Sequence, residues 1–140
     1  MHRLVIDSGV YIDWLNARRH EDILFGPGNV KYLSAVVLME LRAGAFSTPD
    51  RRLVQRLETT FHRAGRILAP TSAIFAQTGD VLRRLQSERG YNIKGGHSIV
   101  NDVLIALSAR SIGAIVATQN ARDFRAIQTI RSFPLKLVSA

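Results

Sequence analysis

Short apolar runs with strand character alternate with longer helical patterns along all 140 residues of the chain. The first run, residues 4–6, is continuously apolar, as strands buried on both faces of a parallel sheet are. Further strands are expected at 30–33, 66–69, 114–117 and 135–138. Strands that alternate with helices imply right-handed crossovers and helices on both faces of the sheet. The sequence therefore predicts an α/β fold, a three-layer α/β/α domain with a central, mainly parallel sheet of about five strands.

Start and stop signals delimit the helices between these strands. Ser34 is expected to cap a helix over 35–45, and Thr48 to cap a helix that begins with Pro49. Two more helices are expected over 71–89, ended by Gly90, and over 98–111. No repeat, linker or low-complexity segment interrupts this pattern. Residues 1–140 are therefore expected to form one domain.

Composition excludes several classes of protein. Apolar residues make up 46% and charged residues 21%, which is unlike a disordered chain. The absence of cysteine excludes disulfides, thiolate nucleophiles and cysteine-type zinc sites. The apolar runs are far shorter than a membrane span, and the N-terminus lacks the apolar core of a signal peptide. We therefore expect a cytoplasmic protein that does not associate with membranes.

The charge balance indicates a polyanionic partner. Nineteen Lys and Arg oppose eleven Asp and Glu, for a formal net charge of +8, and nearly all the cations are arginine. Arginine suits bidentate recognition of phosphate, and nucleic acid is the commonest polyanion that basic proteins bind. Solubility alone or an acidic protein partner would explain the same charge.

Two acidic residues lie in helical segments that are otherwise apolar. Glu40 lies within AVVLMELRAGA, and Asp102 is surrounded by apolar residues in IVNDVLIAL. A carboxylate in such a setting needs a partner, a metal ion or a narrow exposed stripe. For Asp102, an early position in its helix would also be justified by the helix dipole.

Two further acids follow predicted strands. Asp7 follows the first strand and Asp123 comes soon after the strand at 114–117. Taken alone, Asp7 would be a helix N-cap and Asp123 a surface acid. In parallel sheets, however, ligands gather at the carboxyl ends of strands. We therefore expect Asp7, Glu40, Asp102 and Asp123 to meet in one crevice.

Four carboxylates in one pocket repel one another unless a divalent cation neutralises them. Ligand sets made only of oxygen select hard ions, so Mg²⁺ is expected, with Mn²⁺ as a substitute. Such a site suits phosphoryl chemistry, because the ion activates water and stabilises the leaving oxygen.

Four segments, in this order and spacing, resemble the PIN-domain nucleases, particularly the VapC-like toxins of VapBC-type toxin–antitoxin modules. The segments are LVIDSGVYIDWL, SAVVLMELRAG, SIVNDVLIALSAR and IVATQNARDF, and the resemblance extends over essentially the whole chain. It implies a Mg²⁺-dependent endoribonuclease toxin of a type II system, inhibited by a small cognate antitoxin protein and assembled as a homodimer. It also implies in-line attack of an activated water on RNA, with release of a 3′-hydroxyl.

The resemblance assigns roles to particular residues. Asp7, Glu40, Asp102 and Asp123 would be catalytic and would hold the metal. Ser8 and Thr118 match small hydroxyl positions that orient ligands or water. Many relatives have an acid two residues after the threonine, where this chain has Asn120. Asp123 would then complete the site, or Asn120 would serve with three acids.

One alternative comes from a different class of function. A non-catalytic, basic PIN-like module would bind RNA or an antitoxin without cleaving anything. Binding alone does not require a cluster of acids, so the acids favour the catalytic interpretation.

Overall fold

The computed structural model of the chain describes residues 1–94 and 97–140, and in these residues five parallel strands form one sheet. The strands lie in the order β3-β2-β1-β4-β5. Their bounds are β1 (Arg3–Ile6), β2 (Val30–Ser34), β3 (Ile67–Leu68), β4 (Ile115–Thr118) and β5 (Leu135–Leu137). The predicted α/β/α fold with a parallel sheet of about five strands is confirmed, including β3 as an edge strand.

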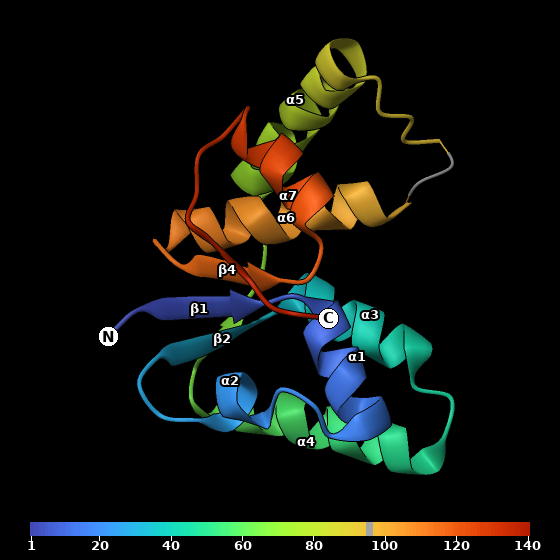
Figure 1. The fold of residues 1–140 in the computed structure, drawn as a ribbon, viewed down its shortest axis with the longest axis vertical. Coiled ribbons are helices and arrows are strands. Elements are labelled where there is room, and N and C mark those ends of the chain that lie inside the picture. Colours follow the sequence, from blue (N-terminus) through green and yellow to red (C-terminus); the bar gives the residue numbers. More distant parts are fainter. Residues whose placement is uncertain (95–96) are drawn as a thin grey trace.

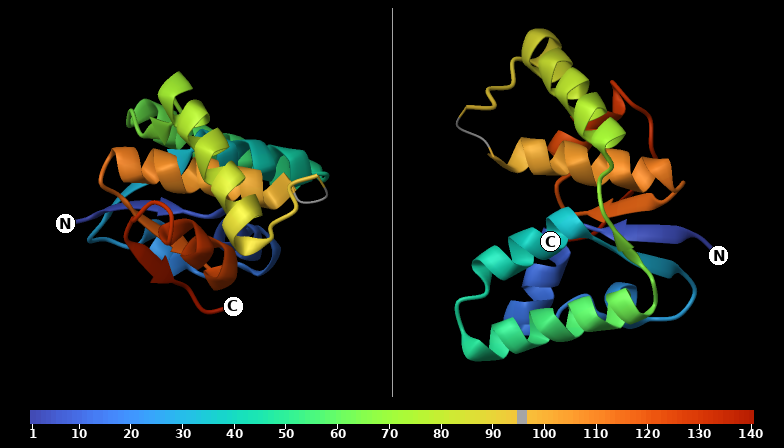
Figure 2. Two further views of the ribbon diagram at one scale, coloured as in Figure 1. Left: turned by 90° about the horizontal axis from the view of Figure 1, so that it is seen from above. Right: turned by 180° about the vertical axis from the view of Figure 1, so that it is seen from behind.

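Helices cover both faces of this sheet (Figures 1 and 2). One face carries α1 (Ser8–Ala17), α2 (Glu21–Phe25), α3 (Ala35–Gly44) and α4 (Thr48–Arg63). The other carries α5 (Ser72–Arg89), α6 (His97–Ser111) and α7 (Ala121–Gln128). Among the described residues, no helix combines the length and the apolar character that a membrane crossing requires.

Local signals account for most helix ends. The Ser34 hydroxyl accepts hydrogen bonds from the amides of Val36 and Val37, so the predicted cap of α3 is confirmed. Gly90 ends α5 in the left-handed conformation, with φ +68°, as expected. The predicted cap of α4 at Thr48 is wrong by one residue. The cap is Ser47, whose hydroxyl reaches the amide of Asp50 at 3.1 Å.

The short helix α2 has no counterpart among the predicted elements. It spans five residues and follows His20, which adopts a left-handed φ of +66°. Glu21 and Asp22 lie in its first turn, where carboxylates interact favourably with the helix dipole. A helix this short leaves too little hydrophobic periodicity for a sequence pattern to indicate it.

The chain reverses its direction of winding between β1 and β4. From the central strand β1 the chain moves to β2 and β3 on one side, and later elements return to β4 and β5 on the other. The carboxyl ends of β1 and β4 lie side by side, with Ile6 in register with Ala117. The amide of Asp7 donates a 2.9 Å hydrogen bond to the carbonyl of Ala117. This junction is the topological switch point at which α/β sheets bind ligands.

Candidate functional site

Asp7 ends β1 and lies at the switch point, with 8% of the residue exposed. Its Oδ1 accepts a 2.9 Å hydrogen bond from the amide of Ser8 and caps α1. Its Oδ2 accepts a 2.8 Å hydrogen bond from the hydroxyl of Thr118, at the end of β4. Burial raises the pKa of Asp7, and these two hydrogen bonds lower it. Asp7 is therefore both a helix cap and a carboxylate fixed between two strand ends.

Asp102 carries the clearest electrostatic signal. It projects from α6, which packs against the sheet, and only 6% of the residue is exposed. Burial, and to a smaller extent the negative charges of Asp7, Asp123 and Glu40, together raise the pKa of Asp102 to about 8. The four acids singled out in the sequence therefore share one electrostatic environment.

Glu40 lies on α3, half-buried beside the same cluster. Its Oε2 accepts a 3.4 Å hydrogen bond from the amide of Asn101, the residue before Asp102. Its Oε1 is buried and has no hydrogen-bond partner among the described residues. Burial and the charge of Asp7 raise the pKa of Glu40, while the side chains of Asn101 and Ser8 lower it.

Asn120 links the remaining acids. Its Nδ2 donates to Oδ2 of Asp102 at 3.3 Å and to Oδ2 of Asp123 at 3.0 Å. Its Oδ1 accepts from the amide of Asp123 at 3.3 Å and so caps α7. Its own amide donates to the Thr118 hydroxyl at 3.0 Å. At the position where relatives were expected to carry an acid, this chain has a neutral donor that holds two acids.

Sequence reasoning missed two residues of this cluster. The Tyr91 hydroxyl donates a 2.8 Å hydrogen bond to Oδ1 of Asp123, and Asn101 contacts Glu40. A tyrosine just after a helix-ending glycine gives no local signal for a contact with α7. Asn101 had a weak signal, because it is a second polar residue beside Asp102 in an apolar helix.

The structure brings together all seven residues selected from the sequence. These are the four acids Asp7, Glu40, Asp102 and Asp123, with Ser8, Thr118 and Asn120 between them. We call these four acids the carboxylate cluster. It lies at the carboxyl ends of β1 and β4, as the strand-end rule predicts.

The donor chemistry of the carboxylate cluster suits a hard divalent cation. Its charged groups are carboxylates, and Oε1 of Glu40 is buried with no hydrogen-bond partner within residues 1–94 and 97–140. Within residues 1–94 and 97–140, no three acidic or histidine side chains stand close enough to form a metal-binding group as placed. The Asn120 amide instead links Asp102 to Asp123. The carboxylates that would hold a cation are thus held near one another by neutral donors.

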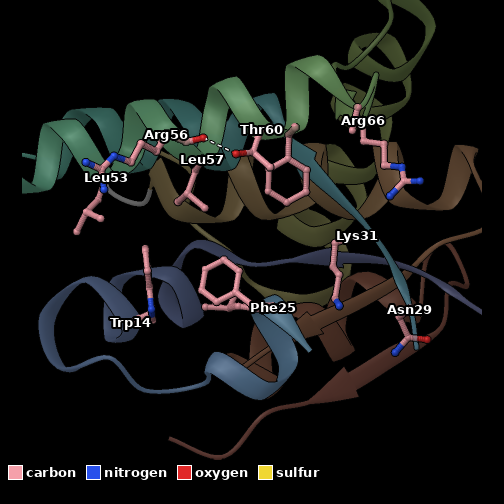
Figure 3. Close-up of a pocket in the computed structure, with 12 residues that line it drawn as sticks. Trp14, Phe25, Asn29, Lys31, Leu53, Arg56, Leu57, Thr60 and Arg66 are labelled. Atoms are coloured by element: carbon pink, nitrogen blue, oxygen red, sulfur yellow. Dashed lines mark hydrogen bonds between the residues drawn. The ribbon is translucent and has the colours of Figure 1, made fainter. Parts of the chain in front are cut away.

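An apolar groove lies within the helical layer formed by α1, α2 and α4 (Figure 3). It has a volume of about 580 Å³ and lies between α1 and α2 on one wall and α4 on the other. Trp14 and Phe25 meet edge to face, with ring centroids 5.0 Å apart, and Phe25 is 50% exposed. Leu53, Leu57 and Phe61 line the α4 wall, and the cations around the groove are Lys31, Arg56 and Arg66. No acidic residue among those described lines this groove.

Comparison with known proteins identifies the family. The profile of the PIN domain matches residues 4–129, so the chain belongs to the PIN-domain family and the expected resemblance is confirmed. A comparison with curated proteins finds no match.

Solved structures share the fold across nearly the whole chain. VapBC2 from Rickettsia felis, bound to a promoter DNA fragment, is 21% identical with a TM-score of 0.70, covering 98% of this chain and 99% of that one. DNA-bound VapBC from Salmonella typhimurium is 22% identical with a TM-score of 0.70, covering 98% of each chain. FitAcB from Neisseria gonorrhoeae is 25% identical with a TM-score of 0.56, covering 95% of this chain and 96% of that one.

Proposed function

We propose that this chain is a Mg²⁺-dependent endoribonuclease and the toxin of a type II toxin–antitoxin system. The observation that carries the proposal is the carboxylate cluster. Four acids from three helices and a strand end share one partly buried environment, which raises the pKa of Asp102 to about 8. A fold gains no stability from burying like charges together, so the arrangement favours a role in chemistry.

The chain's own residues prepare the site for a phosphodiester. Thr118 and the Ser8 amide hold the Asp7 carboxylate, and Asn120 holds Asp102 and Asp123. Glu40 presents an oxygen, Oε1, that has no hydrogen-bond partner in the part of the chain that the structure describes. A Mg²⁺ or Mn²⁺ ion held by these carboxylates would activate water and stabilise the leaving oxygen of RNA. The net charge of +8 favours association with the polyanionic substrate.

A cleavage assay with matched variants tests the proposal. The purified chain should cleave single-stranded RNA with Mg²⁺ or Mn²⁺, leave 3′-hydroxyl ends, and stop on addition of EDTA. Asp7→Asn and Asp102→Asn should lower the rate at least 100-fold. Asp80→Asn is the control, since Asp80 is exposed on α5 and paired with Arg83. Cleavage that survives EDTA or both active-site variants would overturn the mechanism. RNA binding without cleavage would support the non-catalytic alternative.

The apolar groove is the surface that we propose for the antitoxin. The similar solved structures are toxin–antitoxin complexes, and an apolar groove bordered by cations suits an apolar segment with acidic flanks. Trp14 is the one tryptophan of the sequence and lines this groove, so its fluorescence should report occupancy. Expression should arrest growth, and co-expression of a small protein from the adjacent gene should relieve it. Sedimentation of the purified chain should give the mass of a homodimer.

A further inference from the structure

A second pocket, apart from the apolar groove, lies at the corner between α3 and α4. It has a volume of about 310 Å³, and three arginines line it, Arg42, Arg51 and Arg52. The other lining residues are Ala45, Thr48, Val54 and Gln55, so no carboxylate among the described residues lines it. We call this feature the arginine pocket. A cavity lined by three arginines favours a planar or tetrahedral oxyanion as its ligand.

Two of these arginines are held in place by neighbours. Arg51 donates from Nη1 to the carbonyl of Phe46 at 2.7 Å and from Nη2 to the hydroxyl of Thr48 at 3.0 Å. Arg42 pairs with Glu58 across the two helices. Arg52 makes no hydrogen bond or ion pair with the described residues and lies on an exposed helix face. The pocket thus combines the guanidinium of Arg51, which neighbouring groups hold in place, with that of Arg52, which is bonded to none of the described residues.

The arginine pocket adjoins a smaller pocket that reaches one member of the carboxylate cluster. This neighbouring pocket of about 210 Å³ is lined by Glu40 and also by Asp50, and it shares Ala45 with the arginine pocket. Glu40 and Gly44 are four residues apart on α3, which is about 6 Å along the helix axis. A Cβ at Gly44 would meet nothing within 4 Å, so the wall of the neighbouring pocket is open at Gly44.

We propose that the arginine pocket binds a backbone phosphate of RNA whose scissile bond lies at the carboxylate cluster. This inference rests on the proposed function and adds a substrate-binding site to it. A strand that reaches Glu40 continues along the end of α3 and meets Arg42, Arg51 and Arg52. Contacts to phosphate from these residues fix the position of the strand and carry no base specificity.

RNA suits this pocket better than a protein partner does. Helix α4 presents two different faces, since residues 48, 51, 52 and 55 line the arginine pocket while 53, 56, 57 and 60 line the apolar groove. A protein segment gains its binding energy largely from apolar burial, which the apolar groove offers. Among the described residues that line the arginine pocket, only Ala45 and Val54 are apolar.

The arginines of α5 do not share this arrangement. Arg84 and Arg89 line a separate pocket with Glu88, and Arg84 forms a bidentate pair with that glutamate. No residue of the carboxylate cluster lines that pocket. The arginines of α4 and α5 look equivalent in the sequence, but they differ in position. Only the arginine pocket lies next to a pocket that Glu40 lines.

Fluorescence anisotropy with a labelled single-stranded RNA, in EDTA to prevent cleavage, tests the inference. Arg52→Ala should weaken binding about 3- to 10-fold and reduce the slope of log K against log salt by roughly 0.7. Arg52→Lys should recover part of the loss, because it restores the charge without the planar fork. Arg83→Ala is the matched control, since Arg83 is 70% exposed on α5 and paired with Asp80.

Steady-state cleavage gives a second readout. Arg52→Ala should raise KM with little change in kcat, because the contact binds substrate and transition state alike. Circular dichroism checks that each variant is folded, and Arg51→Ala provides a second variant of the pocket. Equal RNA affinity in the Arg51, Arg52 and Arg83 variants would overturn the inference, while intact RNA cleavage would leave the proposed function standing. A variant of the arginine pocket that loses antitoxin affinity and keeps its RNA affinity would also overturn the inference that this pocket binds RNA. A parent protein that neither binds nor cleaves RNA would overturn both.

Discussion

The hydroxyl of Tyr91 donates a 2.8 Å hydrogen bond to Oδ1 of Asp123, a residue 32 positions further along the chain. The other oxygen of the same carboxylate accepts from Asn120 at 3.0 Å. Asp123 is therefore held by the segment after α5 and by the turn after β4. The acid that looked most like an ordinary surface residue in the sequence is fixed at both oxygens.

Tyr91→Phe tests this relationship by removing one hydroxyl. We expect a loss of about 1 kcal/mol in the free energy of unfolding, because a single hydrogen bond to a carboxylate is lost. Since Asp123 would be less well held, affinity for Mn²⁺ should fall several-fold. Urea denaturation and calorimetric titration measure the two effects. Tyr32→Phe is the control, because the Tyr32 hydroxyl has no hydrogen bond among the described residues; equal effects in both variants would show that the hydroxyl of Tyr91 is unimportant.

Asn120→Asp tests whether the amide at this position supports the neighbouring acids. The variant keeps an oxygen for the amide of Asp123 but replaces the Nδ2 donor by a further negative charge. In EDTA at pH 8 we expect a loss of about 1–3 kcal/mol in unfolding free energy. At pH 5 the loss should be smaller, because protonation of a carboxylate relieves the repulsion.

Denaturation at both pH values measures the effect of Asn120→Asp. Asn92→Asp is a matched change at an exposed asparagine outside the carboxylate cluster. It should alter stability by less than about 0.5 kcal/mol. A loss of the same size at pH 5 and pH 8 would contradict an origin in charge repulsion.

The sequence was most informative where the signal is local. The buried run at β1, the cap at Ser34 and the stop at Gly90 each depend on a few adjacent residues, and all were predicted. Glu40 and Asp102 were found because a carboxylate in an apolar helix violates the ordinary pattern. The exact cap of α4 was missed because Ser47 and Thr48 offer equivalent hydroxyls.

Contacts between distant segments could not be read from the sequence. Tyr91 and Asp123 are separated along the chain by α6 and β4, and no sequence periodicity links the two residues. The role of Asn120 depends on the hydrogen bond from its side chain to Asp102, a residue of another helix, which no local pattern indicates. Likewise, Arg52 and Arg84 are equivalent as charges, and only the fold shows that Arg52 lines a pocket next to the one that Glu40 lines.

Phe25→Asp tests the proposed antitoxin surface. Phe25 is 50% exposed and packs against Trp14 in the apolar groove, so a charge there opposes docking of an apolar segment. Antitoxin affinity should fall at least 10-fold, and the antitoxin should no longer relieve growth arrest. Phe75→Asp is the matched control, since Phe75 is 55% exposed on α5 in the other helical layer. Full rescue of the Phe25 variant would place the antitoxin elsewhere.

Asp102→Asn should change how stability depends on pH in the protein without metal. Burial and neighbouring charges raise the pKa of Asp102 from 3.8 to about 8 in the folded chain. Between these values the folded chain retains a proton that the unfolded chain releases, so the stability of the parent protein falls as pH rises from about 4 to 8. The asparagine variant lacks this loss. In EDTA it should be more stable than the parent by a few kcal/mol at pH 8.5 and by little or nothing at pH 4.

Thermal or urea unfolding across this pH range measures the difference, with Asp80→Asn as a variant that should remain parallel to the parent. Because a cation that binds only the folded chain stabilises it, millimolar Mg²⁺ should restore the stability of the parent above pH 7. The same addition should have a smaller effect on Asp102→Asn, which has lost one of the proposed ligands. Parallel stability curves for the parent and Asp102→Asn in EDTA would mean that the Asp102 carboxylate does not cause the loss of stability as pH rises. A Mg²⁺ effect of equal size in both would remove Asp102 from the cation site.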